Sequence, residues 1–171
     1  MTGDKEALRA RLRAVRKSAH AMFGGKAALR LLDHLLVHLG PVEKRVIAGY
    51  WPVGSEIDPR PLMMALEDQG AFLALPVVEG KESALSFRAF SFTDALLPGL
   101  CGSLEPLPGK PLIEPGILLV PLLGFDRSGL RLGQGGGYYD RTLADLRTRG
   151  LVQAIGIAYA AQQVVSLPRK A

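Results

Sequence analysis

Hydrophobic positions recur along this chain with two periods, one typical of helices and the other of strands. Apolar residues spaced at helical intervals predict amphipathic helices over residues 4–19, 26–39, 59–69 and 138–146. Alternating or unbroken apolar runs predict strands over residues 45–51, 71–78, 84–90, 116–123 and 154–159. Residues 97–116 are rich in Pro and Gly and are expected to form a long connection.

Helices and strands follow one another in turn, which indicates the α/β fold class. A length of 171 residues with 48% hydrophobic content suits one domain with a sizeable core and excludes a disordered chain. No composition break marks a second domain, so residues 1–171 are expected to form a single domain. The apolar runs are interrupted before they reach membrane-spanning length. The lone Cys101 fits a reducing cytoplasm and is expected to be a buried, inert thiol.

The most distinctive stretch is a glycine-rich segment, residues 131–141, which reads RLGQGGGYYDR and precedes the last predicted helix. Such a turn exposes backbone N–H groups at the positive end of a helix dipole, which makes an anion-binding site. Arg131 and Arg141 at its two ends carry guanidinium groups suited to phosphate. The glycine spacing matches neither a dinucleotide-binding fingerprint nor a Walker loop. The alternative is a flexible turn that binds no ligand.

The first predicted helix carries a basic stripe beside its apolar seam. The seam, which is expected to pack on the core, consists of Leu8, Leu12, Val15 and Ala19. The basic stripe, which would lie at the rim of a neighbouring cleft, consists of Lys5, Arg9, Arg13 and Arg16. A net charge of +5 favours an anionic partner. Taken alone, however, this helix fits a solvated cationic face better than a phosphate site.

A turn after the first predicted strand contains the chain's single tryptophan, Trp51, followed by Glu56 and Asp58. Ligands of open α/β folds bind where strands end. Trp51 could stack on a ring, and Glu56 could accept hydrogen bonds from ring N–H groups. The alternative places Trp51 in the core. Asp58 is expected to cap the next helix, ahead of Pro59.

Together these segments resemble the 5-formyltetrahydrofolate cyclo-ligase family, also called methenyltetrahydrofolate synthetases. The resemblance covers nearly the whole chain and rests on residues 5–9, 51–56, 104–106, 121–126 and, most specifically, 131–141. It implies a three-layer α/β/α domain with a mostly parallel central sheet. It also implies an ATP- and Mg²⁺-dependent ligase that converts 5-formyltetrahydrofolate to 5,10-methenyltetrahydrofolate and releases ADP and phosphate.

Position by position, the resemblance implies roles for individual residues. The ATP contacts it implies are Lys5, Arg9, Arg131, Gly133, Gln134, Gly135, Gly136, Gly137 and Tyr138. The folate contacts it implies are Trp51, Glu56 and Tyr139, and the acid that helps to hold Mg²⁺ is Asp140. Arg131 and Tyr139 would act in catalysis. The implied substrates are ATP and 5-formyltetrahydrofolate, with or without a polyglutamate tail. No nucleic-acid or membrane partner is expected, and the protein is expected to be a cytoplasmic monomer.

The chemistry of this reaction agrees with the residues present. A formamide oxygen is a poor nucleophile and a poor leaving group, so phosphorylation activates it for attack by the folate amine. Phosphoryl transfer requires mainly alignment and charge neutralisation, and it needs no protein nucleophile.

Two features depart from the family pattern. Gln134 stands where many members carry Lys, Arg or Tyr. The sequence ends with residues 166–171, so it is expected to lack the family's acid-bearing C-terminal segment and final strand. Two alternatives stay open: a non-catalytic nucleotide- or phosphosugar-binding domain, and an RNA-binding accessory protein that uses the basic helix.

Overall fold

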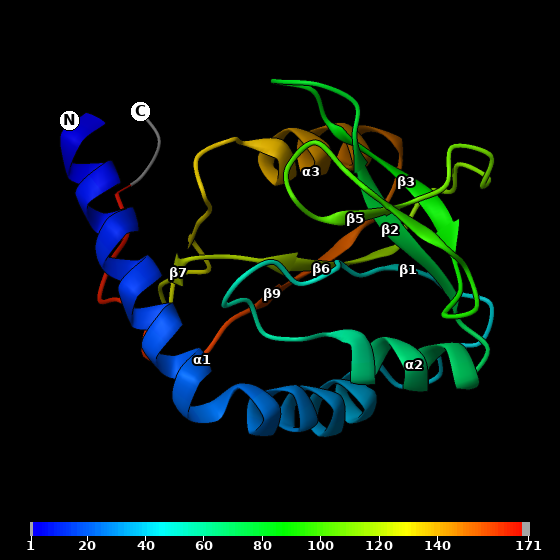
Figure 1. Ribbon diagram of the computed structural model, residues 1–171, viewed down its shortest axis with the longest axis horizontal. Coiled ribbons are helices and arrows are strands. Elements are labelled where there is room, and N and C mark those ends of the chain that lie inside the picture. The colour runs from blue at the N-terminus through cyan, green and yellow to red at the C-terminus, as the bar shows by residue number, and fades with distance from the viewer. Residues whose placement is uncertain (1, 169–171) are drawn as a thin grey trace.

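The computed structural model, which describes residues 2–168, has a five-stranded sheet with helices on both faces (Figure 1). The strand order is β3-β2-β1-β6-β9. The bounds are Val46–Ala48 for β1, Phe72–Val78 for β2, Leu85–Phe90 for β3, Ile117–Pro121 for β6 and Gln153–Ile157 for β9. Only β3 runs antiparallel to its neighbour. The predicted three-layer α/β fold with a mostly parallel sheet is therefore confirmed. The expectation that the family's C-terminal segment is missing rests on residues 166–171. Of these, residues 169–171 lie outside the described residues.

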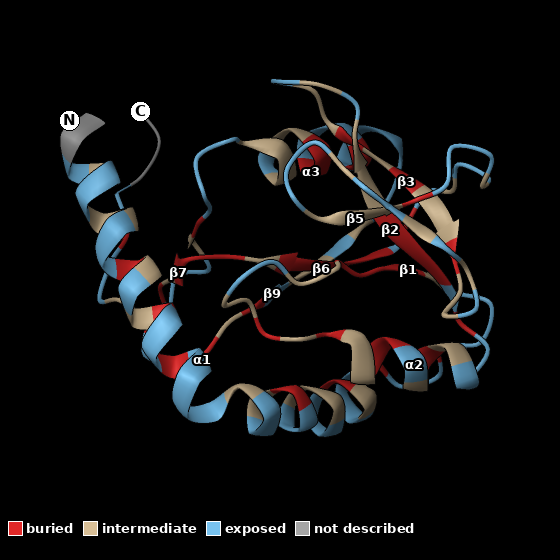
Figure 2. Cartoon of the chain, in the orientation of Figure 1, coloured by how far each residue is buried: buried red, intermediate tan, exposed pale blue. Residues whose placement is uncertain are grey.

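Two helices cover one face of the sheet and one helix covers the other. Helices α1 (Thr2–Leu39) and α2 (Arg60–Asp68) lie below the sheet in Figure 1, and α3 (Tyr138–Arg149) lies above it. Alternate residues of β6 pack into the hydrophobic cores on the two faces of the sheet. Ile117 and Leu119 pack with the α1–α2 side, whereas Leu118 and Val120 pack with α3. Figure 2 shows β6 and β1 buried, as expected for a parallel strand whose apolar run is unbroken.

The prediction of two separate N-terminal helices was wrong, because α1 continues from Thr2 to Leu39. Gly24 and Gly25 lie between the two predicted helices, and α1 bends in this region (Figure 1). Each helical glycine costs about 1 kcal/mol relative to alanine. Packing on both sides of the bend offsets this cost, since Ala19 and Leu35 are both buried in the same core.

The first half of α1 packs through Leu12 of its predicted seam against residues that follow β6. Leu12 is buried against Leu123 and Leu132. A Cβ at Gly124 would lie 2.6 Å from Leu12 Cδ1, so the close approach of α1 requires glycine there. Gly124 belongs to a short hairpin of β7 (Gly124–Phe125) and β8 (Arg131–Leu132), from which the glycine-rich segment continues. The helix is thereby placed beside that segment.

Residues 97–116 were expected to be an irregular connection, but they contain part of a hairpin. Strands β4 (Leu96–Pro98) and β5 (Leu104–Pro106) pair in antiparallel fashion. The Glu105 carboxylate accepts a hydrogen bond of 3.1 Å from the Val78 N–H, which ties the hairpin to the end of β2. Strands of three residues are too short to show a period of two in the sequence.

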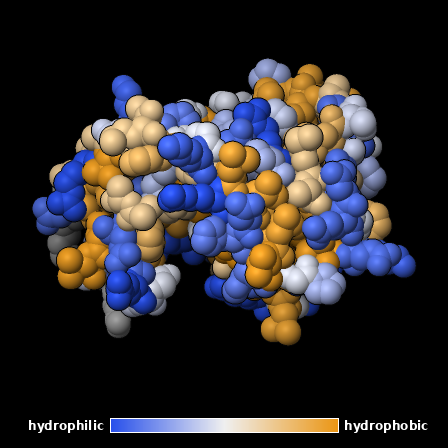
Figure 3. All heavy atoms as spheres, turned by 90° about the horizontal axis from the view of Figure 1, so that it is seen from below, coloured by the Kyte–Doolittle hydropathy of each residue, from blue (hydrophilic) through white to orange (hydrophobic). Residues whose placement is uncertain are grey.

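The prediction that Asp58 is the N-cap of α2 was wrong, because Pro59 occupies the N-cap position and no side-chain cap is formed there. Asp58 lies one residue earlier, where its carboxylate accepts the Arg60 N–H at 3.0 Å. Figure 3 views the molecule from the side of α1 and α2 and shows hydrophobic side chains interspersed with hydrophilic ones. Exposed hydrophobic residues of α1 include Met22, Phe23 and Val37. Between residues 2 and 168 no helix combines the length and the apolar character needed to cross a bilayer.

Candidate active site

A cleft of about 460 Å³ opens where the central parallel strands end. Its walls include Trp51 after β1, Val78 of β2 and Pro121 of β6. The chain turns to opposite faces of the sheet after β1 and after β6, because α2 follows the first and α3 the second. Open α/β sheets bind ligands at such switch points. Three segments that are distant in the sequence meet here: the basic half of α1, the turn containing Glu56 and the glycine-rich loop.

The glycine-rich loop has a backbone that favours glycine. Gly135 has φ +115° and Gly137 has φ +70°, both in the region that L side chains rarely adopt. Gly137 directly precedes α3 and provides no side-chain cap. The first turn of α3 therefore presents N–H groups to the cleft, as the prediction of an anion site requires. The alternative of a flexible turn does not explain why this backbone faces a cleft.

Arg141 does not take the place predicted for it beside a phosphate. Its Nη2 donates to the Gly136 carbonyl at 2.6 Å, and its Nε donates to the Ser83 carbonyl at 3.1 Å. Its guanidinium carbon also lies 5.2 Å from the centre of the Tyr138 ring. Arg141 thus supports the loop through its hydrogen bond to the Gly136 carbonyl, and it is not among the residues that line the cleft.

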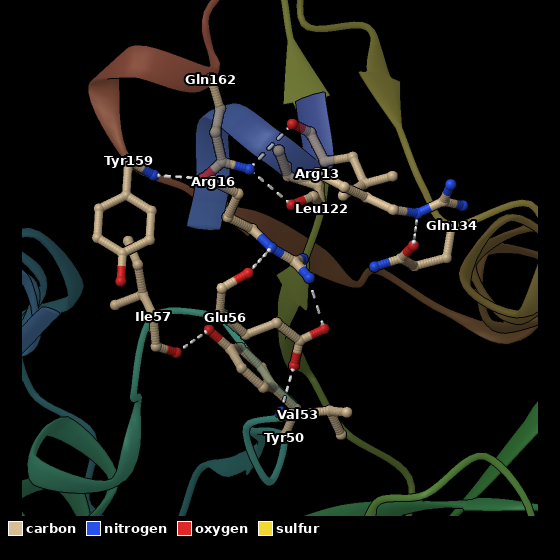
Figure 4. A network of polar contacts seen from close by, with 12 residues as sticks. Arg13, Arg16, Tyr50, Val53, Glu56, Ile57, Leu122, Gln134, Tyr159 and Gln162 are labelled. Carbon is tan, nitrogen blue, oxygen red and sulfur yellow. Dashed lines mark hydrogen bonds and ion pairs between the residues drawn. The ribbon is translucent and has the colours of Figure 1, made fainter. Parts of the chain in front are cut away.

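The basic stripe of α1 lies at the cleft, so the interpretation of this helix face as merely solvated was wrong. Lys5, Arg9 and Arg16 line the cleft. Arg9 Nε donates to the Gly133 carbonyl at 3.1 Å. Arg13 Nε donates to Gln134 Oε1 at 3.1 Å (Figure 4), which brings a guanidinium to the position where the family pattern carries a different side chain.

Glu6, whose role no motif in the sequence indicated, interacts with two of these arginines. Its carboxylate lies 3.2 Å from Arg9 Nη1 and 2.9 Å from Arg13 Nη1. These hydrogen bonds, first that of Arg13 and then that of Arg9, lower the pKa of Glu6. The helix thus presents Arg9 and Arg13 to the loop in a fixed arrangement.

Arg131 and Asp140 form an ion pair at the other end of the loop. Arg131 Nη2 lies 2.5 Å from Asp140 Oδ1, and both residues line the cleft. The pair places a guanidinium suited to phosphate next to a carboxylate suited to a hard cation. Within residues 2–168, no cluster of three or more His, Cys, Asp or Glu side chains could hold a metal by itself.

The turn after β1 presents Glu56 to the cleft (Figure 4). The Val53 N–H donates to Glu56 Oε2 at 2.9 Å, and the Tyr50 hydroxyl donates to the Ile57 carbonyl at 2.6 Å, which closes the turn. The Glu56 side chain is only 13% exposed. Burial raises the pKa of this carboxyl, while the Val53 N–H and the Arg16 charge oppose that rise. Glu56 is therefore a buried acceptor held in place by its own turn.

Trp51 and Tyr139 complete the wall around Glu56. Trp51 lines the cleft and also packs edge-on against Phe90 with ring centres 6.1 Å apart, so it contributes to the cleft wall and to the core, while its stacking on a substrate ring stays a prediction. Its ring also lies 5.0 Å from the Arg60 guanidinium. Burial, followed by the Glu56 charge, raises the pKa of the Tyr139 hydroxyl. Tyr139 consequently stays protonated and can donate a hydrogen bond.

The prediction that Cys101 is buried was wrong. The thiol is exposed and lines the cleft, because the β4–β5 hairpin folds over its edge. A hydrogen bond with Cys101 is the leading cause that raises the pKa of the Tyr138 hydroxyl. The β4–β5 hairpin was not apparent in the sequence, so the sequence did not indicate that Cys101 lies at the cleft.

Cys101 offers a direct probe of the cleft, since it is the chain's single cysteine. A maleimide is expected to label the protein once, and saturating cleft ligands are expected to slow labelling severalfold because they cover the thiol. The rate can be followed by mass spectrometry, with Cys101→Ser as the unlabelled control. Labelling at one rate with and without ligand would show that ligands bind elsewhere.

Comparison with known proteins agrees with this geometry. Residues 1–171 match the 5-formyltetrahydrofolate cyclo-ligase family. The 5-formyltetrahydrofolate cyclo-ligase of Haemophilus influenzae is 31% identical over 172 residues, which cover 98% of this chain and 91% of that protein. The enzyme of the same name from Escherichia coli K12 is 31% identical over 166 residues, or 94% of this chain and 88% of its own.

Two solved structures share the fold. The 5,10-methenyltetrahydrofolate synthetase of Aquifex aeolicus superposes with a TM-score of 0.78 at 30% identity, covering 98% of this chain and 84% of that one. The synthetase of Mycoplasma pneumoniae gives a TM-score of 0.73 at 26% identity, covering 97% and 92%. With the family matched along its full length and these relatives along nearly all of it, this chain belongs to the 5-formyltetrahydrofolate cyclo-ligase family, a family of ligases.

Proposed function

We propose that this protein uses ATP and Mg²⁺ to close 5-formyltetrahydrofolate into 5,10-methenyltetrahydrofolate, with release of ADP and phosphate. The observation that carries this proposal is that the glycine-rich loop and the buried carboxylate of Glu56 line one cleft. Two substrates that must react with each other can therefore lie side by side. The exposed thiol of Cys101 suits a reducing cytoplasm, where we place the protein as a monomer.

The triphosphate would bind along the glycine-rich loop. Backbone N–H groups at residues 133–138 and the positive end of α3 would receive phosphate oxygens. Lys5 and Arg9 from α1 and Arg131 from β8 would neutralise their charge. Gln134, which is held by Arg13, would fix the loop beside the nucleotide.

The folate would bind at the opposite side of the cleft. The Glu56 carboxylate would accept hydrogen bonds from the N–H groups of the pterin ring. Trp51 would form an apolar wall for that ring. The protonated Tyr139 interacts with both Glu56 and Arg131 and would donate a hydrogen bond to the formyl oxygen or to the transferred phosphoryl group.

The reaction then follows in two steps. The formyl oxygen attacks the γ-phosphorus of ATP, and the bond to the β-phosphate oxygen breaks to release ADP. The N10 amine of the folate attacks the activated formyl carbon, N10 loses its proton, and the C–O bond breaks to release phosphate. Arg131 would stabilise negative charge on the transferred group, and the walls of the cleft would align the reacting atoms.

Asp140 is the residue that fits Mg²⁺. Its carboxylate lines the same cleft as the phosphate loop. Magnesium commonly takes one or two protein carboxylates and completes its shell with phosphate oxygens and water, so a single acid suits a metal that arrives with ATP. The metal would neutralise charge on the phosphates.

The proposed activity has a direct assay. Protein mixed with ATP, Mg²⁺ and 5-formyltetrahydrofolate is expected to produce the absorbance of the methenyl product together with equal amounts of ADP and phosphate. Mixtures that lack ATP or protein serve as controls. Tight nucleotide binding with neither folate binding nor product would instead identify a non-catalytic nucleotide-binding domain.

Replacing Asp140 with asparagine is expected to raise the Mg²⁺ concentration needed for half-maximal turnover by about tenfold, since a neutral amide is a weaker ligand for Mg²⁺. Asp145→Asn is the matched control, because Asp145 lies on the same helix and pairs with Arg149 at 2.8 Å outside the cleft. A Mg²⁺ titration of turnover distinguishes the two variants. Identical titration curves for both would remove Asp140 from the metal site.

A further inference from the structure

Arg16 is a buried arginine at the wall of the cleft whose charge the proposed reaction does not use. The residue is 7% exposed, whereas Arg9 and Arg13 on the same stripe reach the glycine-rich loop. Its Nε donates to Ser55 Oγ at 3.0 Å. Its Nη1 is buried and has no hydrogen-bond partner. Burying a guanidinium is costly unless an opposite charge compensates it.

The opposite charge is Glu56. Arg16 Nη1 lies 3.8 Å from Glu56 Oε1, and the two side chains are 8% and 13% exposed. Figure 4 shows the guanidinium of Arg16 directed from α1 toward the Glu56 carboxylate, which in turn accepts the Val53 N–H. Because little water reaches the pair, each charge acts strongly on the other.

The other groups around Glu56 do not supply a positive charge. Tyr50, which follows β1, and Tyr139 on α3 both face it, and burial raises the pKa of each hydroxyl so that both stay neutral. Asp58, in the same turn, is paired with Arg60 at 2.8 Å. Among the described residues that interact with Glu56, Arg16 therefore supplies the compensating cation.

We propose that Arg16 is the counter-ion that keeps Glu56 ionised, so that the carboxylate can accept hydrogen bonds from the substrate ring. Arg16 is thus a positioning residue that acts through Glu56. The inference rests on the proposed function for the identity of the substrate, since it takes Glu56 to bind the folate.

The sign of the pH dependence follows from the opposing influences on Glu56. Burial raises the pKa of the carboxyl, whereas the Val53 N–H and then the Arg16 charge lower it. A protonated carboxyl loses an acceptor, so folate binding falls as the pH drops through the pKa of Glu56. Without Arg16 this pKa rises further, and the loss of binding begins at a higher pH.

The experiment compares Arg16→Gln and Arg16→Lys with the wild type from about pH 5 to about pH 9, measuring the folate KM, kcat and the ATP Kd. Arg16→Gln is expected to move the acid limb of folate binding upward by about one pH unit or more. Its KM should recover at high pH, and its ATP Kd should stay close to that of the wild type. Arg16→Lys retains the charge and should restore most of the wild-type profile.

Lys17→Gln is the matched control, since Lys17 is the adjacent, exposed cation on α1 and does not line the cleft. Its pH profile should equal that of the wild type. In a Glu56→Gln background, Arg16→Gln should produce no further shift of the limb. A KM that rises equally at every pH, or lysine and glutamine variants that behave alike, would overturn the proposal in favour of a packing role.

A second variant covers the case in which Arg16→Gln does not fold. Ser55→Ala removes the hydrogen bond to Arg16 Nε but leaves both charges, and it should move the limb in the same direction by a smaller amount. An unchanged limb in this variant would also overturn the proposal.

Failure of the proposed function would be visible separately, as the absence of methenyl product from the wild type. The ionisation of Glu56 can still be followed then, by ¹³C NMR of its carboxyl carbon, assigned by its disappearance in Glu56→Gln. A Glu56 titration that is the same with and without Arg16 would refute the counter-ion role, whatever reaction the cleft performs.

Discussion

Replacing Gly135 with alanine is expected to weaken ATP binding by about 5- to 150-fold. Gly135 has φ +115°, where a side chain strains the backbone, and such strain costs about 1–3 kcal/mol. The added methyl would lie 3.5 Å from Arg9 Cζ, an ordinary contact, so the effect comes from backbone strain. The loop would leave its binding conformation most of the time, and the apparent ATP affinity would fall by the same factor.

Calorimetric titration with ATP and Mg²⁺ measures this loss, and thermal unfolding shows whether the fold is intact. Stability should change little, since Gly135 is exposed. Gly109→Ala is the control, because Gly109 is exposed, has no strained φ and leaves open space for a methyl group. A folded Gly135→Ala protein with wild-type ATP affinity would mean that the loop is not the phosphate site.

Replacing Glu56 with glutamine is expected to raise the folate KM by about 10- to 150-fold, which corresponds to a loss of about 1.5–3 kcal/mol for a charged acceptor. Glutamine keeps a carbonyl oxygen for the Val53 N–H, so the turn should persist. ATP affinity should hardly change, because the contacts proposed for ATP come from the loop and α1.

Steady-state kinetics with each substrate varied in turn separates these effects. Asp58→Asn provides a matched control, since Asp58 lies in the same turn but pairs with Arg60 and does not line the cleft. Equal losses of folate and ATP affinity in Glu56→Gln would indicate that Glu56 supports the fold of the turn and does not recognise the pterin.

Elements with strong internal patterns were predicted well. The unbroken apolar run gave β6, and the helix predicted over residues 59–69 corresponds to α2 (Arg60–Asp68). Most apolar residues of these two segments are buried, so the pattern of apolar positions directly indicates the type of element. The resemblance added the three-layer arrangement and the residues of the site, and the structure brings those residues into one cleft.

Several predictions that were wrong share one cause. Two helices were predicted over residues 4–19 and 26–39, but contacts to the core on both sides keep α1 continuous. The β4–β5 hairpin consists of strands too short to show a period, and Cys101 was consequently misplaced. In each case a partner distant in the sequence decided the local structure, which propensity alone does not capture.

The sequence by itself determined the local chemistry of the site. Glycines 135 and 137 specify a backbone with positive φ before α3, and the turn that holds Glu56 is closed by the nearby Val53 N–H. These features depend on conformations and hydrogen bonds within a few residues, which the order of amino acids fixes directly.

Only the tertiary structure decided which of these pieces meet. Arg9 reaches the Gly133 carbonyl across 124 positions of sequence, and Arg16 reaches Ser55 across 39 and lies beside Glu56. These contacts follow from the close packing of Leu12 on Gly124, which places α1 beside the glycine-rich loop. Whether a basic side chain on a helix is solvated, binds a phosphate or compensates a buried acid depends on the neighbour that packing supplies, and helical spacing carries no information about that neighbour.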